Sequence, residues 1–123
     1  MTAITRQDMA TKLEKTLRLS GDLYTLDDIM VAIEEGRMQS FTVDDTWIIT
    51  QVLEFPRRKV LEITFVIGFL NEAVKALPAL YAFARSIGAT RVTGFGREGW
   101  MNFAEPGWKL VGSMYAKELT DGG

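Results

Sequence analysis

The sequence predicts a single mixed α+β domain, and three observations support this fold class. Two amphipathic helical segments open the chain, three strand-like runs with short turns follow, and a strand–helix–strand succession comes after them. Short turns favour antiparallel pairing, whereas a helix that crosses between two strands favours a parallel pair. The expected architecture is therefore a mixed sheet with N-terminal helices, an antiparallel meander, a central crossover and a C-terminal strand.

The two opening helices are predicted from their capping residues and from apolar residues at helical spacing. Residues 5–20 begin at Thr5 and carry an apolar stripe formed by Met9, Leu13 and Leu17. Thr25 and Asp28 form a second capping pattern, and Gly36 is suited to end the helix that follows. The stripe of this second helix consists of Leu26, Ile29, Met30 and Ile33.

Three strands should form the meander, because β-branched and aromatic residues alternate with turn residues. The predicted strands are Met38–Val43, Thr46–Phe55 and Val60–Ile67. The turns between them are Asp44-Asp45 and Pro56–Lys59.

The second half predicts a crossover helix over residues 72–87 and a parallel strand over Arg91–Phe95. The apolar face of the helix keeps its spacing through Val74, Leu77, Leu80, Ala84 and Ile87. Pro78 lies among these residues, so it either kinks the helix or starts it after an irregular turn. A short helix and an alternating strand over Trp108–Leu119 should close the domain.

Composition limits the possible chemistry. The 123 residues suit one domain over residues 1–119, with a disordered tail at 120–123. The chain has no Cys and no His, so thiolate nucleophiles, imidazole bases and Cys or His metal sites are excluded, and no metal site is predicted. The net charge of −2 makes nucleic acid an improbable partner, and no apolar run suggests a membrane span or a signal peptide. The expected compartment is the cytoplasm.

The order of elements and four short segments resemble the GNAT (Gcn5-related N-acetyltransferase) fold. The segments are GRMQSF (36–41), FPRRKVLEITF (55–65), GREGW (96–100) and PGWKL (106–110). More narrowly, the chain looks like the small GNAT-like proteins of tailed bacteriophages, some of which are internal virion or assembly proteins. The resemblance covers about residues 20–119, and for a phage-encoded protein it implies a location in the host cytoplasm or the virion.

The resemblance implies acetyl-CoA as a candidate cofactor, held by backbone amides between the central strand and its helix. The matching positions are Val66, Ile67, Gly68, Phe69 and Asn71. The family usually carries Arg/Gln-x-x-Gly-x-Gly/Ala here, and this chain has one glycine, no Arg or Gln anchor, and bulky side chains. The helix also opens with Glu72, whose charge would repel a phosphate.

Two residues are candidates for acid–base catalysis. The resemblance places Glu62 on the central strand, where some family members keep a glutamate base. Tyr115, on the predicted last strand, could act as a general acid. The alternative is that Glu62 is solvated or paired with Arg57 or Arg91, and that Tyr115 is a packed aromatic residue.

A second group of residues suits contact with another protein. Arg57 and Arg58 form the densest positive cluster together with Lys59, although such a cluster is also typical of a solvated turn. Arg97, Trp100 and Trp108 could form a protein-contact surface, or the two Trp residues could pin the short helix to the sheet.

The sequence thus favours a GNAT-fold protein that has lost catalysis and acts in virion structure, assembly or host interaction, with a virion or host protein as its partner. The alternative is an active acetyl-CoA-dependent N-acetyltransferase, and an unrelated α+β binding domain is a third interpretation. Homo-oligomers are compatible with each interpretation.

Overall fold

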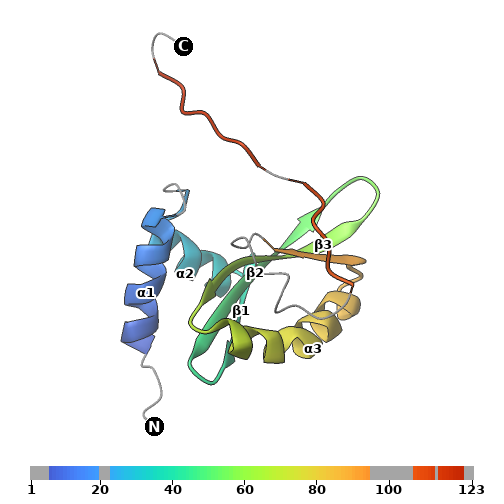
Figure 1. Ribbon diagram of the computed structural model, residues 1–123, viewed down its shortest axis with the longest axis horizontal. Helices are drawn as coiled ribbons and strands as arrows, with labels where there is room; N and C mark the ends of the chain where they lie inside the picture. The colour runs from blue at the N-terminus through green and yellow to red at the C-terminus, as the bar shows by residue number, and fades with distance from the viewer. Residues whose placement is uncertain (1–5, 20–22, 95–106, 113, 121–123) are drawn as a thin grey trace.

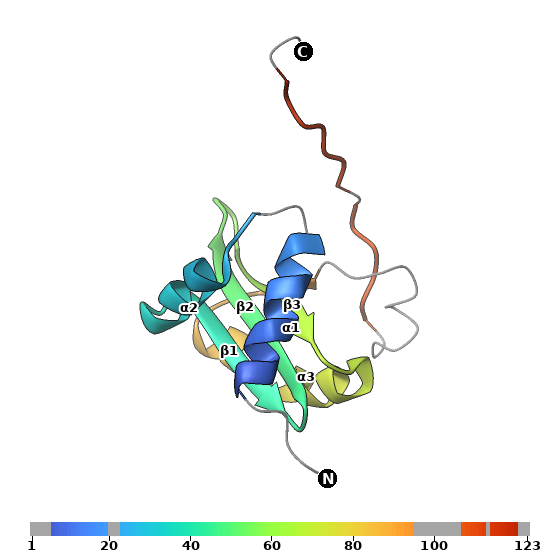
Figure 2. The ribbon, with the colours of Figure 1, turned by 90° about the vertical axis from the view of Figure 1, so that its left-hand side faces the viewer.

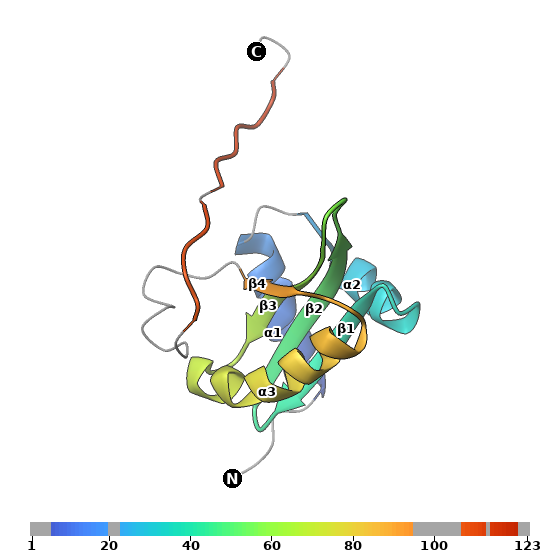
Figure 3. The same ribbon diagram turned by 90° about the vertical axis from the view of Figure 1, so that its right-hand side faces the viewer.

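The computed structural model describes residues 6–19, 23–94, 107–112 and 114–120, and confirms a mixed α+β fold (Figure 1). The elements in chain order are α1 (Arg6–Leu19), α2 (Leu26–Glu34), β1 (Met38–Val43), β2 (Thr46–Glu54), β3 (Lys59–Ile67), α3 (Leu70–Ser86) and β4 (Arg91–Gly94). Helices α1 and α2 cover one face of the sheet, and α3 covers the other (Figures 2 and 3).

The sheet has the topology that the turns and the crossover predict. Its strands lie in the order β1-β2-β3-β4. The first two pairings are antiparallel and the third, between β3 and β4, is parallel. The meander and the parallel crossover pair are both confirmed.

Helix α2 is capped as its sequence indicates. The Thr25 hydroxyl accepts a hydrogen bond from the Asp28 N–H at 3.1 Å, and the Asp28 carboxylate accepts one from the Thr25 N–H at 2.8 Å. Gly36 follows the helix with φ at +80°, a conformation that side chains other than glycine adopt only at a cost. The chain can therefore turn directly from α2 into β1.

Helix α3 contains Pro78 in its interior, so the possibility that this proline starts the helix is wrong. The helix begins at Leu70, two residues before the predicted start. Its buried residues form one face, consisting of Ala73, Ala76, Leu77, Leu80 and Ala84. Pro78 is exposed on the opposite side, where water can satisfy the carbonyl that loses its partner.

The sheet separates two hydrophobic clusters, and β3 contributes to both because it contains a bulge. Ile49 pairs with Phe65 while the next residue of β2, Thr50, pairs with Ile63, which leaves Thr64 as the extra residue. Before the bulge, Leu61 and Ile63 pack against α3; after it, Phe65 and Ile67 pack against α1 and α2. Strict alternation would have placed these four odd-numbered residues on a single face.

The predicted strand over Trp108–Leu119 does not form. Residues 107–112 and 114–120 contain neither helix nor strand, and beyond Trp108 they run away from the domain (Figure 1). Alternating residues favour an extended conformation, but a strand also needs a neighbouring edge with which to pair. The predicted short helix before this segment lies outside the described residues.

Candidate functional site

The first candidate site is the loop between β3 and α3, where the sequence resemblance placed the phosphates of a cofactor. The strand ends at Ile67 and Phe69 is the N-cap of α3, with Gly68 between them at a φ of +132°. A Cβ on Gly68 would lie 2.6 Å from Thr46 Oγ1 and 2.8 Å from the Asp45 carbonyl oxygen. Glycine is thus required because the loop packs tightly against the β1–β2 turn.

Thr46, at the start of β2, connects this loop to the first turn of α3. Its side chain is fully buried. Its hydroxyl accepts a hydrogen bond from the Phe69 N–H at 2.8 Å and donates one to Glu72 Oε1 at 2.7 Å. The same carboxylate oxygen accepts a bond from the Asp45 N–H at 3.1 Å. Three elements therefore meet at one hydroxyl group.

Two features of this loop disfavour a pyrophosphate held by successive loop amides. The Phe69 N–H already donates to Thr46, and the first turn of α3 carries the Glu72 carboxylate. A negative side chain at a helix N-terminus stabilises the helix by interacting with its dipole, and it repels a second anion at the same place. The Phe69 amide and the Glu72 carboxylate are thus both engaged with Asp45 and Thr46, an arrangement that disfavours a phosphate at this place.

The second candidate site lies on the other side of the sheet, beside α2. Glu62 on β3 is half-buried, and its Oε1 accepts hydrogen bonds from Gln51 Nε2 at 3.0 Å and from the Thr64 hydroxyl at 3.2 Å. Gln51 is its direct cross-strand partner on β2. The carboxylate is therefore held in place by neighbours on the sheet, and neither Arg57 nor Arg91 forms one of these bonds.

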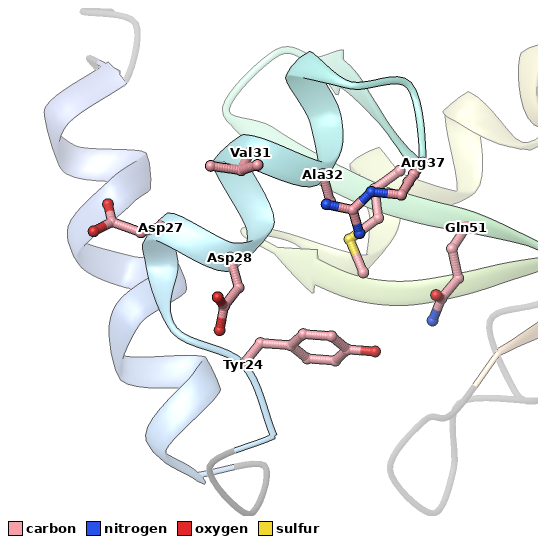
Figure 4. A pocket seen from close by; sticks show the side chains of 8 residues that line it. Tyr24, Asp27, Asp28, Val31, Ala32, Arg37 and Gln51 are labelled. Carbon is pink, nitrogen blue, oxygen red and sulfur yellow. The ribbon is translucent and has the colours of Figure 1, made fainter.

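Gln51 also lines a cavity of about 400 Å³ between the sheet and α2 (Figure 4). The other lining residues are Tyr24, Asp27, Asp28, Val31, Ala32, Arg37 and Met38. In Figure 4 the Tyr24 ring lies below Asp28, and its hydroxyl points towards Gln51. The Tyr24 ring also makes an edge contact with Phe65, with centroids 6.1 Å apart. The cavity thus combines an aromatic wall with carboxylate and amide groups.

The charges around the cavity are partly engaged within the domain. Hydrogen bonds from the Thr25 N–H and hydroxyl hold the pKa of Asp28 below its ordinary value of 3.8, with a smaller contribution from Arg37. The Arg37 guanidinium forms an exposed ion pair with Glu35 at 2.9 Å. Asp28 is thus a carboxylate at neutral pH and serves first as the cap of α2.

The structure does not bring together the two residues predicted for acid–base catalysis. Tyr115 is 93% exposed and belongs to the C-terminal segment that leaves the domain, whereas Glu62 lies on the central strand. Because the predicted last strand is absent from residues 107–112 and 114–120, Tyr115 has no neighbour on the sheet in this arrangement.

The residues predicted for protein contact lie in different environments. Arg57 and Arg58 are exposed in the β2–β3 turn, next to Phe55, whose side chain is 54% exposed. Trp108 is half-buried against α3, and its Nε1 donates a hydrogen bond to the Tyr81 hydroxyl at 2.9 Å. Arg97 and Trp100 lie outside the described residues.

Sequence reasoning missed Thr46, Gln51 and the bulged Thr64. Polar residues within β-rich runs have no local signature that distinguishes a buried hydrogen-bonding group from a surface one. The one available signal was Glu72, since an acidic residue in the first helical turn commonly seeks a nearby donor.

Within residues 6–19, 23–94, 107–112 and 114–120, no three acidic side chains gather as a metal site would require. None of the helices in that same part combines the length and hydropathy needed to cross a membrane.

Comparison with solved structures establishes the fold type. A protein described as a probable acetyltransferase superposes with a TM-score of 0.66 at 12% identity, covering 98% of this chain and 97% of its own. A Trypanosoma brucei acetyltransferase gives 0.61 at 18% identity, covering 89% and 94%. A Thermus thermophilus protein gives 0.59 at 14% identity, covering 97% and 98%. The sequence matches no family model and no curated protein. The chain therefore has an acetyltransferase-like, GNAT-type fold.

Proposed function

We propose that this protein uses an acetyltransferase-like fold for contact with other proteins and not for acyl transfer. The observation that supports this proposal most directly is the Thr46–Glu72 arrangement at the start of α3. The backbone N–H of Phe69, which the fold family would offer to a pyrophosphate, already donates to Thr46. The Glu72 carboxylate lies in the first turn of α3. The sequence resemblance to phage proteins suggests a virion or host protein as the partner.

The β2–β3 turn is the surface best suited to such contact. Phe55 and the two arginines that follow Pro56 are all exposed, and a hydrogen bond of 2.9 Å from the Phe55 N–H to the Arg58 carbonyl closes the turn. Aromatic and arginine side chains are enriched where protein interfaces are strongest. An ordered turn also presents them at a lower entropic cost than a flexible loop does.

A second function, N-acetyl transfer, is favoured by the cavity that Gln51, the hydrogen-bond partner of Glu62, lines. Asp28 and Tyr24 line this cavity, and Gln51 links it to the Glu62 carboxylate; together these groups could hold a cationic amine and accept its proton. This function additionally requires an acyl donor. The fold type suggests acetyl-CoA, and the loop at Phe69 disfavours binding of its phosphates.

Titration calorimetry with CoA and acetyl-CoA separates these two functions. The proposal predicts a Kd weaker than about 1 mM, which corresponds to less than about 4 kcal/mol of binding free energy. Micromolar binding would overturn the contact function. Acyl transfer to a polyamine or peptide amine would then be measured for the wild type and Glu62→Gln, which keeps the shape of the side chain but removes the base.

The Glu72→Gln variant tests the cause of the weak binding. It preserves an acceptor for Thr46 and Asp45 while removing the charge, so it should bind CoA at least several-fold more tightly than the wild type. Glu54→Gln removes an exposed charge from the far end of the sheet and is the matched control. An equal affinity for all three proteins would contradict the role assigned to Glu72.

The contact function itself is tested in particles of the phage that would encode the chain. Quantitative mass spectrometry of purified particles should find the protein at a fixed copy number. Alternatively, the wild-type protein should be part of a protein complex in infected cells, and the variant with Arg57→Glu and Arg58→Glu should be absent from that complex. Absence from both, with a folded variant protein, would overturn the proposal.

A further inference from the structure

The C-terminal arm, defined here as residues 109–112 and 114–120, is attached to the domain at one well-defined point. Trp108, immediately before it, packs into the α3 cluster and donates its indole N–H to Tyr81. Val92 of β4 packs against the same cluster. Beyond Trp108 the chain leaves the domain in an extended course (Figure 1). The arm thus starts from the cluster under α3, which β4 also contacts.

The composition of the arm is inconsistent with a simple solvated tail. Five large apolar side chains on it are between 69% and 93% exposed, namely Leu110, Val111, Met114, Tyr115 and Leu119. Soluble monomers rarely expose so many large apolar groups in one continuous stretch, and such stretches usually mark a contact surface. The arm also has the β-branched and aromatic content of a strand.

The sheet offers an edge that such a strand could use. In the described part of the chain, β4 is the last strand and spans only Arg91–Gly94. Its pairing with β3 ends at Ile63, so Thr64–Ile67 continue past the last β4 partner. An exposed strand edge presents unpaired backbone groups, and an added strand would satisfy them.

We propose that the C-terminal arm pairs with the β4 edge of a second copy of this chain, and that the second copy's arm pairs with the first in return. Such an exchange is isologous, because each copy gives and receives the same segment. The location of Trp108 supports it: Trp108 and Val92 both pack against the α3 cluster, so the arm leaves from the cluster that β4 also contacts, and a twofold axis near β4 brings each departing arm to its partner's β4. This inference is independent of whether the protein binds CoA.

The apolar area available is sufficient for a dimer. Burying a side chain of this size contributes about 1.5–3 kcal/mol at about 25 cal/mol per Å², which corresponds to about 100 Å² each. Two arms bring ten such side chains, or on the order of 1,000 Å², before backbone pairing and the receiving surface are counted. Specific interfaces begin near about 1,200 Å² in total, so reciprocal exchange reaches this range and a single arm does not.

Light scattering coupled to size-exclusion chromatography tests the oligomeric state of the full chain. The expected mass is twice the 13.8 kDa of one chain at micromolar concentration. A variant that ends at Lys109 keeps Trp108 and should be a folded monomer, with its fold verified by circular dichroism. A monomeric full chain, or a dimer that survives the truncation, would overturn the proposal.

A point substitution tests the apolar contact without shortening the chain. Val111→Asp should raise the dimer dissociation constant at least tenfold. Lys117→Gln changes the net charge by the same amount on a polar position of the arm and should leave the constant within about twofold. Equal effects of the two substitutions would show that charge, and not apolar pairing, controls association.

Hydrogen exchange identifies the surface that receives the arm. In the full-length dimer, amides of both the arm and β4 should exchange more slowly than in the folded monomer. The arm could instead be protected while residues 91–94 exchange at the same rate as in the truncated protein. That result would indicate arm-to-arm association and refute the assignment to β4.

Discussion

Replacement of Thr46 by Val is the sharpest test of how the β3–α3 loop is held. Valine has nearly the same shape as threonine, so the buried site stays filled and no cavity forms. What disappears is the hydroxyl that accepts from the Phe69 N–H at 2.8 Å and donates to Glu72 Oε1 at 2.7 Å. The substitution therefore isolates hydrogen bonding from packing.

The expected loss of stability follows from these two bonds. The Phe69 amide is only part-buried, so leaving it without its acceptor costs towards the lower end of about 1–3 kcal/mol, and a lost hydrogen bond to a charged group costs about 1.5–3 kcal/mol. Glu72 keeps the bond from the Asp45 N–H, which reduces the second contribution. We expect a decrease of about 3 kcal/mol in the free energy of unfolding. For a domain of this size, that decrease lowers Tm by about 12 °C.

Urea denaturation and thermal melting of the wild type and Thr46→Val measure this effect. Thr42→Val, an exposed position on β1, is the matched control and should change stability by less than about 0.5 kcal/mol. A double-mutant cycle with Glu72→Gln should give a coupling energy between about 0.5 and 3 kcal/mol. A Thr46→Val protein as stable as its control, or strict additivity in the cycle, would refute the reasoning.

Two further substitutions test the loop and the cap of α2. Gly68→Ala should destabilise the protein by about 1–3 kcal/mol, because its Cβ would lie 2.6 Å from Thr46 Oγ1 at a φ of +132°. Gly112→Ala is the control: a Cβ there would have no atom within 4 Å, so it should be neutral in the same urea titration. The lowered pKa of Asp28 means that its carboxylate stabilises the fold above its ordinary pKa of 3.8 and that this contribution is lost as the pH falls through the lower folded-state pKa. The stability difference between wild type and Asp28→Asn should therefore be largest near pH 7 and shrink below about pH 4. A pH-independent difference would show that the Thr25 bonds do not depend on charge. Asp27→Asn controls for the loss of one charge in the same turn.

The elements that the sequence predicts correctly are those decided by local interactions. The capping box at Thr25 and Asp28 involves residues three positions apart, and the three strands of the meander are connected by short turns. Helix α3 shows the limit of this approach. Its apolar face outweighs Pro78, because tertiary packing of that face stabilises the helix more than one proline on the solvent side destabilises it.

The features that the sequence did not predict depend on contacts between distant segments. Thr46 and Glu72 are 26 residues apart, and no local pattern pairs them. The alternation over Trp108–Leu119 is a genuine β signal, but pairing depends on whether an edge is available, which the segment's own residues do not encode. Gln51 and Glu62 become neighbours only through the register of β2 and β3.

The bulge at Thr64 has a consequence for how substitutions in β3 combine. Leu61 and Ile63 belong to the cluster under α3, whereas Phe65 and Ile67 belong to the cluster under α1 and α2. Sequence variation at Ile63 should therefore follow variation in α3, and variation at Phe65, only two positions further on, should follow variation in α1 and α2. Along the length of one strand, the chain passes between two sets of packing neighbours, and Thr64 is the boundary between them.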